Sequence, residues 1–169
     1  MMRGLYIGRF QPFHNGHKAA VEYISSEVDE LIIGIGSSQL SHEVLHPFTA
    51  GERVLMITRA LSHLNIPLYV LPIPDVHRNA IWVSHVCSMV PQFDVVYSSN
   101  PQVIRLFREA GIEVRSPPMY ERSTLSGTHI RKLLLSGGNW EEFVPEETAE
   151  IIKSVDGVSR IIDISKNDE

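Results

Sequence analysis

Cysteine is almost absent from this chain: Cys87 is the only one among 169 residues, so an intramolecular disulfide is impossible. It lies in the apolar stretch IWVSHVCSMV, where we expect a buried, structural thiol. No apolar run approaches the length of about 20 residues that a membrane-spanning helix requires. The first apolar segment begins within a few residues of Met1, which leaves no room for a secretory signal. We therefore expect an intracellular, cytoplasmic protein.

An excess of positive charge is also lacking. The sequence holds 15 Lys and Arg against 20 Asp and Glu, which gives a formal net charge of −5 at pH 7. Such a chain has no global basic field to attract nucleic acid or an anionic membrane surface. A local cluster of cations and backbone amides must therefore bind any phosphate group. We expect small-molecule partners and neither nucleic acid nor membrane.

Short apolar runs alternate about five times with segments of helical periodicity. The strands are expected at residues 5–8, 30–36, 67–73, 93–97 and 112–115, and the helices at about 16–28, 52–64, 80–89, 101–110, 126–137 and 145–155. Pro72 indicates that the third strand ends early or lies at an edge. The alternation predicts an α/β fold, with one Rossmann-like doubly wound domain over residues 1–169 and a mostly parallel sheet of five or six strands. A short charged tail, about 165–169, is expected to fray.

The segment GRFQPFHNGH joins the first strand to the first helix. His14 and His17 stand around Gly16 at the helix start, where unpaired N–H groups and a partial positive charge suit an anion. Gly8 lets a ligand approach the backbone, and Gly16 leaves room for a nucleotide on the helix start. Two alternatives stay open: a capped helix with surface histidines, and a zinc site, for which two histidines supply too few ligands.

Other polar residues follow later strands. Ser37, Asp75 and Ser98 each come after a strand end, and the carboxyl ends of parallel strands share one crevice. The segment SGTHIR, residues 126–131, caps a late helix whose free amides suit a triphosphate. Arg131 adds a planar, bidentate donor one turn into that helix. Without the first motif, this segment is equally typical of an ordinary capped amphipathic helix.

The pattern of Gly8, Phe10, Pro12, His14, Gly16 and His17 is the signature of the nucleotidylyltransferase superfamily, in the strand-to-helix context that it requires. Gly127 departs from the second Ser or Thr of most members and resembles the archaeal-type branch. Residues 3–157 as a whole resemble the archaeal-type nicotinamide-nucleotide adenylyltransferases. The most telling pieces are GRFQPFHNGH, PFTAGER, PDVHRNAIWVSHV, YSSNP and YERSTLSGTHIR.

That resemblance implies an enzyme that joins ATP and nicotinamide mononucleotide (NMN) into NAD and pyrophosphate. The NMN 5′-phosphate would attack the ATP α-phosphate directly and in line, with Mg²⁺ or another divalent cation carried by ATP. It also implies a homohexamer. The catalytic residues would be His14, His17 and Arg131, with no protein-bound metal. The ATP-binding residues would be Gly8, Arg9, Phe10, His14, Gly16, His17, Ser98, Asn100, Arg122, Ser126, Gly127, Thr128, Ile130 and Arg131. The NMN- and NAD-binding residues would be Ser37, Ser38, Phe48, Arg53, Asp75, Asn79, Trp82 and Val83.

Several alternatives stay open at this point. A pantetheine-phosphate adenylyltransferase or a cytidylyltransferase would share both end motifs, and a non-catalytic nucleotide sensor could keep the fold. A class I aminoacyl-tRNA synthetase fragment would lack its lysine loop here. Among single residues, Trp82 could be a core side chain, Asp75 a helix cap, and Arg53 the partner of a neighbouring carboxylate.

Overall fold

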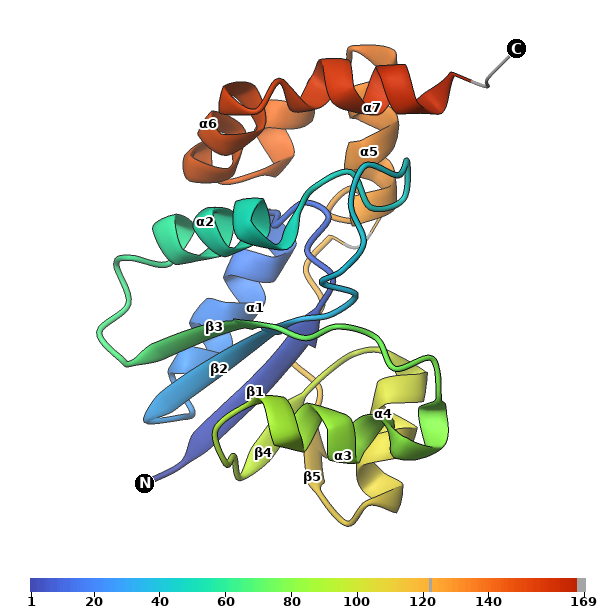
Figure 1. The fold of residues 1–169 in the computed structure, drawn as a ribbon. Helices are drawn as coiled ribbons and strands as arrows, with labels where there is room; N and C mark the ends of the chain where they lie inside the picture. The colour runs from blue at the N-terminus through green and yellow to red at the C-terminus, as the bar shows by residue number, and fades with distance from the viewer. Residues whose placement is uncertain (122, 167–169) are drawn as a thin grey trace.

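The structure is a computed structural model that describes residues 1–121 and 123–166 (Figure 1). It confirms the alternation of strands and helices. The strands are β1 (Arg3–Gly8), β2 (Glu30–Ile35), β3 (Leu68–Pro72), β4 (Val95–Tyr97) and β5 (Glu113–Arg115). The helices are α1 (Asn15–Ser25), α2 (Ala50–Ala60), α3 (Asn79–Met89), α4 (Pro101–Glu109), α5 (Gly127–Ser136), the 3₁₀ turn η1 (Trp140–Phe143), α6 (Glu146–Ser154) and α7 (Gly157–Ser165).

All strand pairs of the sheet are parallel, and their order is β3-β2-β1-β4-β5. The central strand β1 pairs through Leu5 with Ile32 on one side and with Val96 on the other. The direction of winding changes between β1 and β4, and a ligand crevice forms at the carboxyl ends of such strands. The predicted five-stranded parallel sheet is confirmed. β3 is an edge strand, as Pro72 indicated.

Helices cover both faces of the sheet. α1 and α2 lie on one face, with α5, α6 and α7 stacked beyond them, whereas α3 and α4 lie on the other (Figure 1). Each face has its own apolar core. Leu31 and Ile33 of β2 belong to the core under α1 and α2, and the intervening Ile32 belongs to the core under α3 and α4. Burial on both faces explains why the strands are apolar at nearly every position.

The C-terminal region differs from the prediction. Residues after 157 were expected to run into a frayed tail, but they form α7, in which Ile161 is fully buried. Arg160 of α7 donates to both carboxylate oxygens of Glu52 on α2, at 2.7 and 2.9 Å. Asp156, a residue type that often caps helices, stands at the start of α7, but its side chain accepts no N–H and makes no cap. Residues 167–169 of the expected tail lie outside the described residues.

Cys87 also differs from the prediction, because its side chain is exposed. Only Val86 of α3 is buried, so the helix presents most of its length to solvent, and the apolar spacing around Cys87 does not mark a core face. None of the helices in the described part of the chain has the length and apolarity that crossing a membrane demands.

Candidate active site

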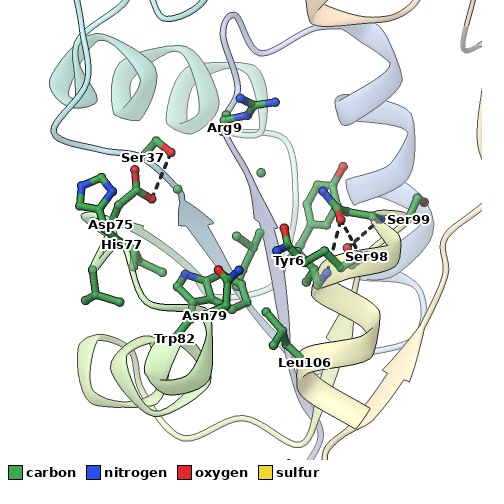
Figure 2. Close-up of a pocket in the computed structure, with 18 of the residues that line it drawn as sticks. Tyr6, Arg9, Ser37, Asp75, His77, Asn79, Trp82, Ser98, Ser99 and Leu106 are labelled. Atoms are coloured by element: carbon green, nitrogen blue, oxygen red, sulfur yellow. Dashed lines mark hydrogen bonds between the residues drawn. The ribbon is translucent and has the colours of Figure 1, made fainter. Parts of the chain in front are cut away.

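Two adjoining cavities lie at the carboxyl edge of the sheet. The larger, of about 560 Å³, lies between the ends of β1 and β2 and the starts of α3 and α4 (Figure 2). The smaller, of about 110 Å³, lies between the start of α1 and residues 117–120. Tyr6, His17 and Ser99 line both cavities. The two cavities are therefore chambers of one crevice, and His17 stands at their junction.

His14 and His17 cap the first turn of α1 reciprocally. The Nδ1 atom of His14 accepts the backbone N–H groups of Gly16 and His17, at 3.1 and 3.3 Å, and the Nδ1 atom of His17 accepts the N–H of His14 at 3.2 Å. A backbone N–H only donates, so the accepting Nδ1 atoms carry no proton. Each neutral ring therefore carries its proton on Nε2, as a hydrogen-bond donor that remains free of the helix cap.

Packing fixes the orientation of both rings. The His14 and His17 rings stack with centroids 3.6 Å apart, and the His17 ring also stacks on Phe13 at 5.6 Å and meets the edge of Phe10 at 4.8 Å. Desolvation, with a smaller contribution from the Arg131 guanidinium, lowers the pKa of His14 to about 4. Desolvation and the neighbouring His14 hold the pKa of His17 well below its ordinary value. Both imidazoles are therefore neutral donors at pH 7.

Gly8 lines the larger cavity and Gly16 lines the smaller one, and both glycines also make room for rings of the protein itself. A Cβ atom on Gly16 would lie 3.0 Å from Cε1 of His14 and 3.2 Å from the Cβ of Leu125. A Cβ atom on Gly8 would lie 2.9 Å from the Phe10 ring. That ring is 1% exposed, so the side chain of Phe10 belongs to the core rather than to an ATP site.

The start of α5 lies beside the histidines. Ser126 accepts the N–H of His129 at 3.2 Å, and Arg131 donates through Nη1 to the carbonyl of Gln11 at 2.9 Å. Desolvation, together with the charge of Arg9, lowers the pKa of Arg131. A Cβ atom at Gly127 would lie 2.6 Å from the Arg131 Nη1 atom, so a Ser or Thr there would require the guanidinium to shift. Arg131 is thus hydrogen-bonded to the GRFQPFHNGH segment, through Gln11.

Two other residues of the SGTHIR segment differ in their burial. Ile130 is fully buried in the core, whereas Thr128 is exposed at the start of α5. Neither residue lines the two cavities. The predicted ATP contact at Arg122 lies outside the described residues.

The predicted NMN residues Ser37, Asp75, Asn79 and Trp82 all line the larger cavity (Figure 2). The Asp75 carboxylate accepts hydrogen bonds from Ser37 Oγ at 3.2 Å and from Gln39 Nε2 at 3.0 Å. Trp82 packs edge-on against Phe107 with ring centroids 5.5 Å apart, so its ring is both a cavity wall and part of the core. The two interpretations of Trp82 are compatible.

Four other residues predicted for NMN do not line that cavity: Ser38, Phe48, Arg53 and Val83. Phe48 and Arg53 are fully buried. Arg53 donates to six backbone carbonyls, so a direct phosphate contact, as the resemblance implied, would require breaking those bonds. Val83 packs with the core under α3 and α4. Backbone and core contacts account for these side chains.

Several cavity residues were missed or only partly anticipated. Ser98 and Asn100 line the larger cavity, although they were expected on the adenosine side. Ser99, expected with them, lines both cavities. The residues that were missed are Tyr6, Ile7, Gly36, Ile73, Val76, His77, Arg78, Gln102, Val103 and Leu106. Most of them follow strand ends or begin a helix, so their position at the carboxyl edge of the sheet could have predicted that they line the crevice.

Arg9 is exposed and extends along the larger cavity. Its Nη1 atom lies 3.5 Å from His46 Nε2, and His46 Nδ1 lies 3.2 Å from Glu43 Oε2. The described residues contain no group of three or more His, Cys, Asp or Glu side chains placed to hold a metal ion.

Comparison with known proteins gives consistent matches. The cytidylyltransferase-like family model matches residues 5–133. The nicotinamide-nucleotide adenylyltransferase of Methanocorpusculum labreanum is 63% identical, over 99% of this chain and 100% of that protein, and that of Halobacterium salinarum is 55% identical, over 99% and 95%.

A solved structure shares the fold: the bifunctional NMN adenylyltransferase/ADP ribose pyrophosphatase of Francisella tularensis, in complex with AMP and a manganese ion. It has a TM-score of 0.77 and 20% identity, over 96% of this chain, which spans about half (52%) of that protein. The family model covers well over half of the chain, and the archaeal relatives match it nearly end to end. The chain therefore belongs to the cytidylyltransferase-like family and, within it, to the nicotinamide-nucleotide adenylyltransferases.

Proposed function

We propose that this protein transfers AMP from ATP to nicotinamide mononucleotide, giving NAD and pyrophosphate. The observation that carries the proposal is the histidine pair with its two Nε2–H donors: His17 lines both chambers, and His14 lines the smaller one. Two chambers on either side of one donor site suit two nucleotides that react through their phosphates. The names of the archaeal relatives supply the identity of the acceptor.

The reaction needs no nucleophile from the protein. An oxygen of the NMN 5′-phosphate attacks the α-phosphorus of ATP, and a new P–O bond forms as the bond to the bridging α–β oxygen breaks. The electron pair of that bond leaves with pyrophosphate. The protein's task is to align the two phosphates and to stabilise the charge that develops between them.

Each residue near the junction has a part in that task. His17 and His14 donate to the non-bridging oxygens of the α-phosphate as charge develops there. Arg131 and the backbone amides that open α5 hold the β- and γ-phosphates. Mg²⁺ enters bound to ATP and neutralises part of the triphosphate charge. The metal needs only phosphate oxygens and waters as ligands, so a protein cage is not required.

The larger chamber suits the mononucleotide. Trp82 offers a flat aromatic face for the electron-poor nicotinamide ring. Asp75 and Asn79 supply an acceptor and an amide for the ribose hydroxyls and the carboxamide. Arg9 extends from the loop after β1 toward the phosphate end.

An assay of pyrophosphate release tests the proposal and its rivals. The protein is incubated with Mg-ATP and, in separate reactions, NMN, nicotinate mononucleotide or pantetheine phosphate; a parallel reaction supplies Mg-CTP. We expect release with NMN, with NAD formed in equal amount. Pyrophosphate release with pantetheine phosphate but not with NMN would overturn NMN as the acceptor, and release with CTP but not with ATP would overturn ATP as the donor. ATP binding without pyrophosphate release would indicate a nucleotide sensor.

The direct, in-line attack has its own test. ATP made chiral at the α-phosphorus with sulfur and oxygen isotopes is converted to product, and the configuration at phosphorus is determined. One direct transfer inverts the configuration. Retention would mean two transfers through a covalent enzyme intermediate, which contradicts the mechanism.

The resemblance to the archaeal family supports three further proposals. All 169 residues form one nucleotidylyltransferase domain, the chains assemble into a hexamer, and the protein works in the cytoplasm. Sedimentation equilibrium tests the assembly, since a hexamer of 19.0 kDa chains differs sixfold in mass from a monomer.

A further inference from the structure

Arg53 is fully buried and surrounded by backbone carbonyl groups. Its Nε atom donates to Thr49 at 3.2 Å, and its two Nη atoms donate to Arg9 at 2.9 Å, Gly36 at 3.1 Å, Ser37 at 3.4 Å, Ser38 at 3.3 Å and Leu40 at 3.2 Å. The carboxylate of Glu52, the neighbour of Arg53 in sequence, forms its ion pair with Arg160 instead. Burying a cation with dipoles alone as partners is costly, so this arrangement needs a reason beyond packing.

The carbonyls that Arg53 binds belong to two segments that wall the larger chamber. One is the loop after β1, through Arg9, and the other is residues 36–40 after β2. Arg9, Gly36 and Ser37 line that chamber, and Arg9 and Ser37 lie on the same side of it, across from Trp82 (Figure 2). Arg53 thus lies directly behind the wall that faces Trp82.

The geometry of the peptide unit determines where the N–H groups next to these carbonyls point. The peptide unit is planar and trans, so a carbonyl and the following N–H point in opposite directions. The carbonyls of Arg9 and Gly36 accept from Arg53, so the N–H groups of Phe10 and Ser37 point away from it. Ser37 itself lines the chamber. Backbone N–H groups held in this way form an anion site, and a positive charge behind them strengthens it.

We propose that Arg53 is a positioning residue for the 5′-phosphate of the mononucleotide. It holds the peptide planes after β1 and β2 so that their N–H groups face the phosphate, and its unpaired charge favours the anion without touching it. This inference rests on the proposed function and adds a binding site within it. It also replaces the direct phosphate contact expected for Arg53.

Two variants of Arg53 and one matched control test the proposal. Arg53→Met keeps an unbranched apolar side chain but removes the charge and all donors, and Arg53→Lys keeps the charge with fewer donors. The control is Arg160→Met, which removes another arginine attached to the start of α2, through Glu52 and the carbonyl of Pro47. Arg160 lines neither chamber. Melting temperature and circular dichroism report on folding in all three.

We expect Arg53→Met to raise the KM for NMN about tenfold or more while the KM for ATP changes less than about threefold, with Arg53→Lys between it and the wild type. Arg160→Met should lower the melting temperature and leave both KM values unchanged. A folded Arg53→Met protein with both KM values unchanged, or raised equally, would overturn the proposal. If Arg53→Met does not fold, Arg53→Lys decides by the same criterion.

Calorimetric binding of NMN without ATP separates this proposal from the proposed function. If the wild type releases no pyrophosphate, the proposed function fails. The Arg53 proposal is then judged by the dissociation constant of NMN, which should rise in both Arg53 variants and not in Arg160→Met. Equal dissociation constants in all four proteins, or no binding of NMN by the wild type, would overturn it.

Discussion

The histidine region, residues 8–17, and the α3 wall, residues 75–83, face the same crevice but are built in opposite ways. In the histidine region the rings stack on one another, cap their own helix and pack against Phe10 and Phe13. In the α3 wall, Arg78 begins the helix without a side-chain cap, and residues 77–81 are exposed. Packing and capping within the protein fix the histidine region, whereas residues 77–81 of the α3 wall are exposed to solvent.

This difference matches two kinds of work. A group that stabilises a transition state must be in place before the reaction, since reorganisation during the step would cost much of the gain. A group that recognises a substrate can complete its contacts as the substrate binds. The contrast predicts that changes in the histidine region lower kcat, whereas changes in the α3 wall raise the KM of one substrate.

The largest expected effect is that of His17→Ala. The variant removes the Nε2–H donor at the junction of the two chambers, and loss of one transition-state donor lowers turnover by about a hundredfold or more. The measurement is kcat for NAD formation at saturating substrates, with circular dichroism as a check on the fold. Wild-type-like turnover in the folded variant would contradict the catalytic role of His17.

The second effect is on stability at low pH. The pKa of His14 is about 4 in the folded chain, against 6.5 for an unperturbed histidine such as that of the unfolded chain. Below pH 6.5 the unfolded state therefore binds more protons than the folded state, and stability is lost as the pH falls. For this residue we expect the free energy of unfolding to fall by about 2 kcal/mol between pH 7 and pH 5.

Urea unfolding at both pH values measures this loss. The control is His14→Asn, which keeps a capping acceptor and removes the titrating ring. Its loss of stability between pH 7 and pH 5 should be smaller than that of the wild type by about 2 kcal/mol. Equal losses in the two proteins would show that His14 is not buried as a neutral ring.

The smallest effect is expected in the α3 wall. Trp82→Ala removes the aromatic face of the larger chamber and should raise the KM for NMN about tenfold, on the scale of one lost aromatic contact, with a smaller change for ATP. Trp82→Phe keeps a ring and its packing against Phe107, so it should recover most of the affinity. If both KM values rise equally in Trp82→Ala, Trp82 is structural and the contrast between the two regions fails.

Much of the fold follows from local signals in the sequence. The parallel sheet follows from unbroken apolar strands separated by helices. Thr49, Asn100 and Ser126 are of the residue types that favour helix starts, and their side chains cap α2, α4 and α5. α7 was not predicted, although Asp156 is a residue type that often precedes a helix; in the structure its side chain makes no cap. A helix without a side-chain cap is held by tertiary packing, as by the Arg160–Glu52 ion pair.

The candidate site was only partly predictable, for a related reason. Ser37 and Asp75 follow strand ends, so topology alone brings them to the crevice. Arg53 and Phe48 lie in PFTAGER, one of the segments that carry the family resemblance. Whether a side chain in such a segment points to the crevice or to the core depends on contacts with residues far along the chain. The carbonyls that hold Arg53 come from residues 9 to 49, and no periodicity encodes that arrangement.

The central claim is that His14 and His17 form a preformed pair of neutral rings with their protons on Nε2. Nitrogen-15 NMR of histidine-labelled protein tests it most directly, because the two ring nitrogens have different shifts in each tautomer and in the charged ring. At pH 7 the account predicts, for both residues, a protonated Nε2 and an unprotonated Nδ1. A charged ring or a protonated Nδ1 at either residue in the ligand-free protein would contradict it.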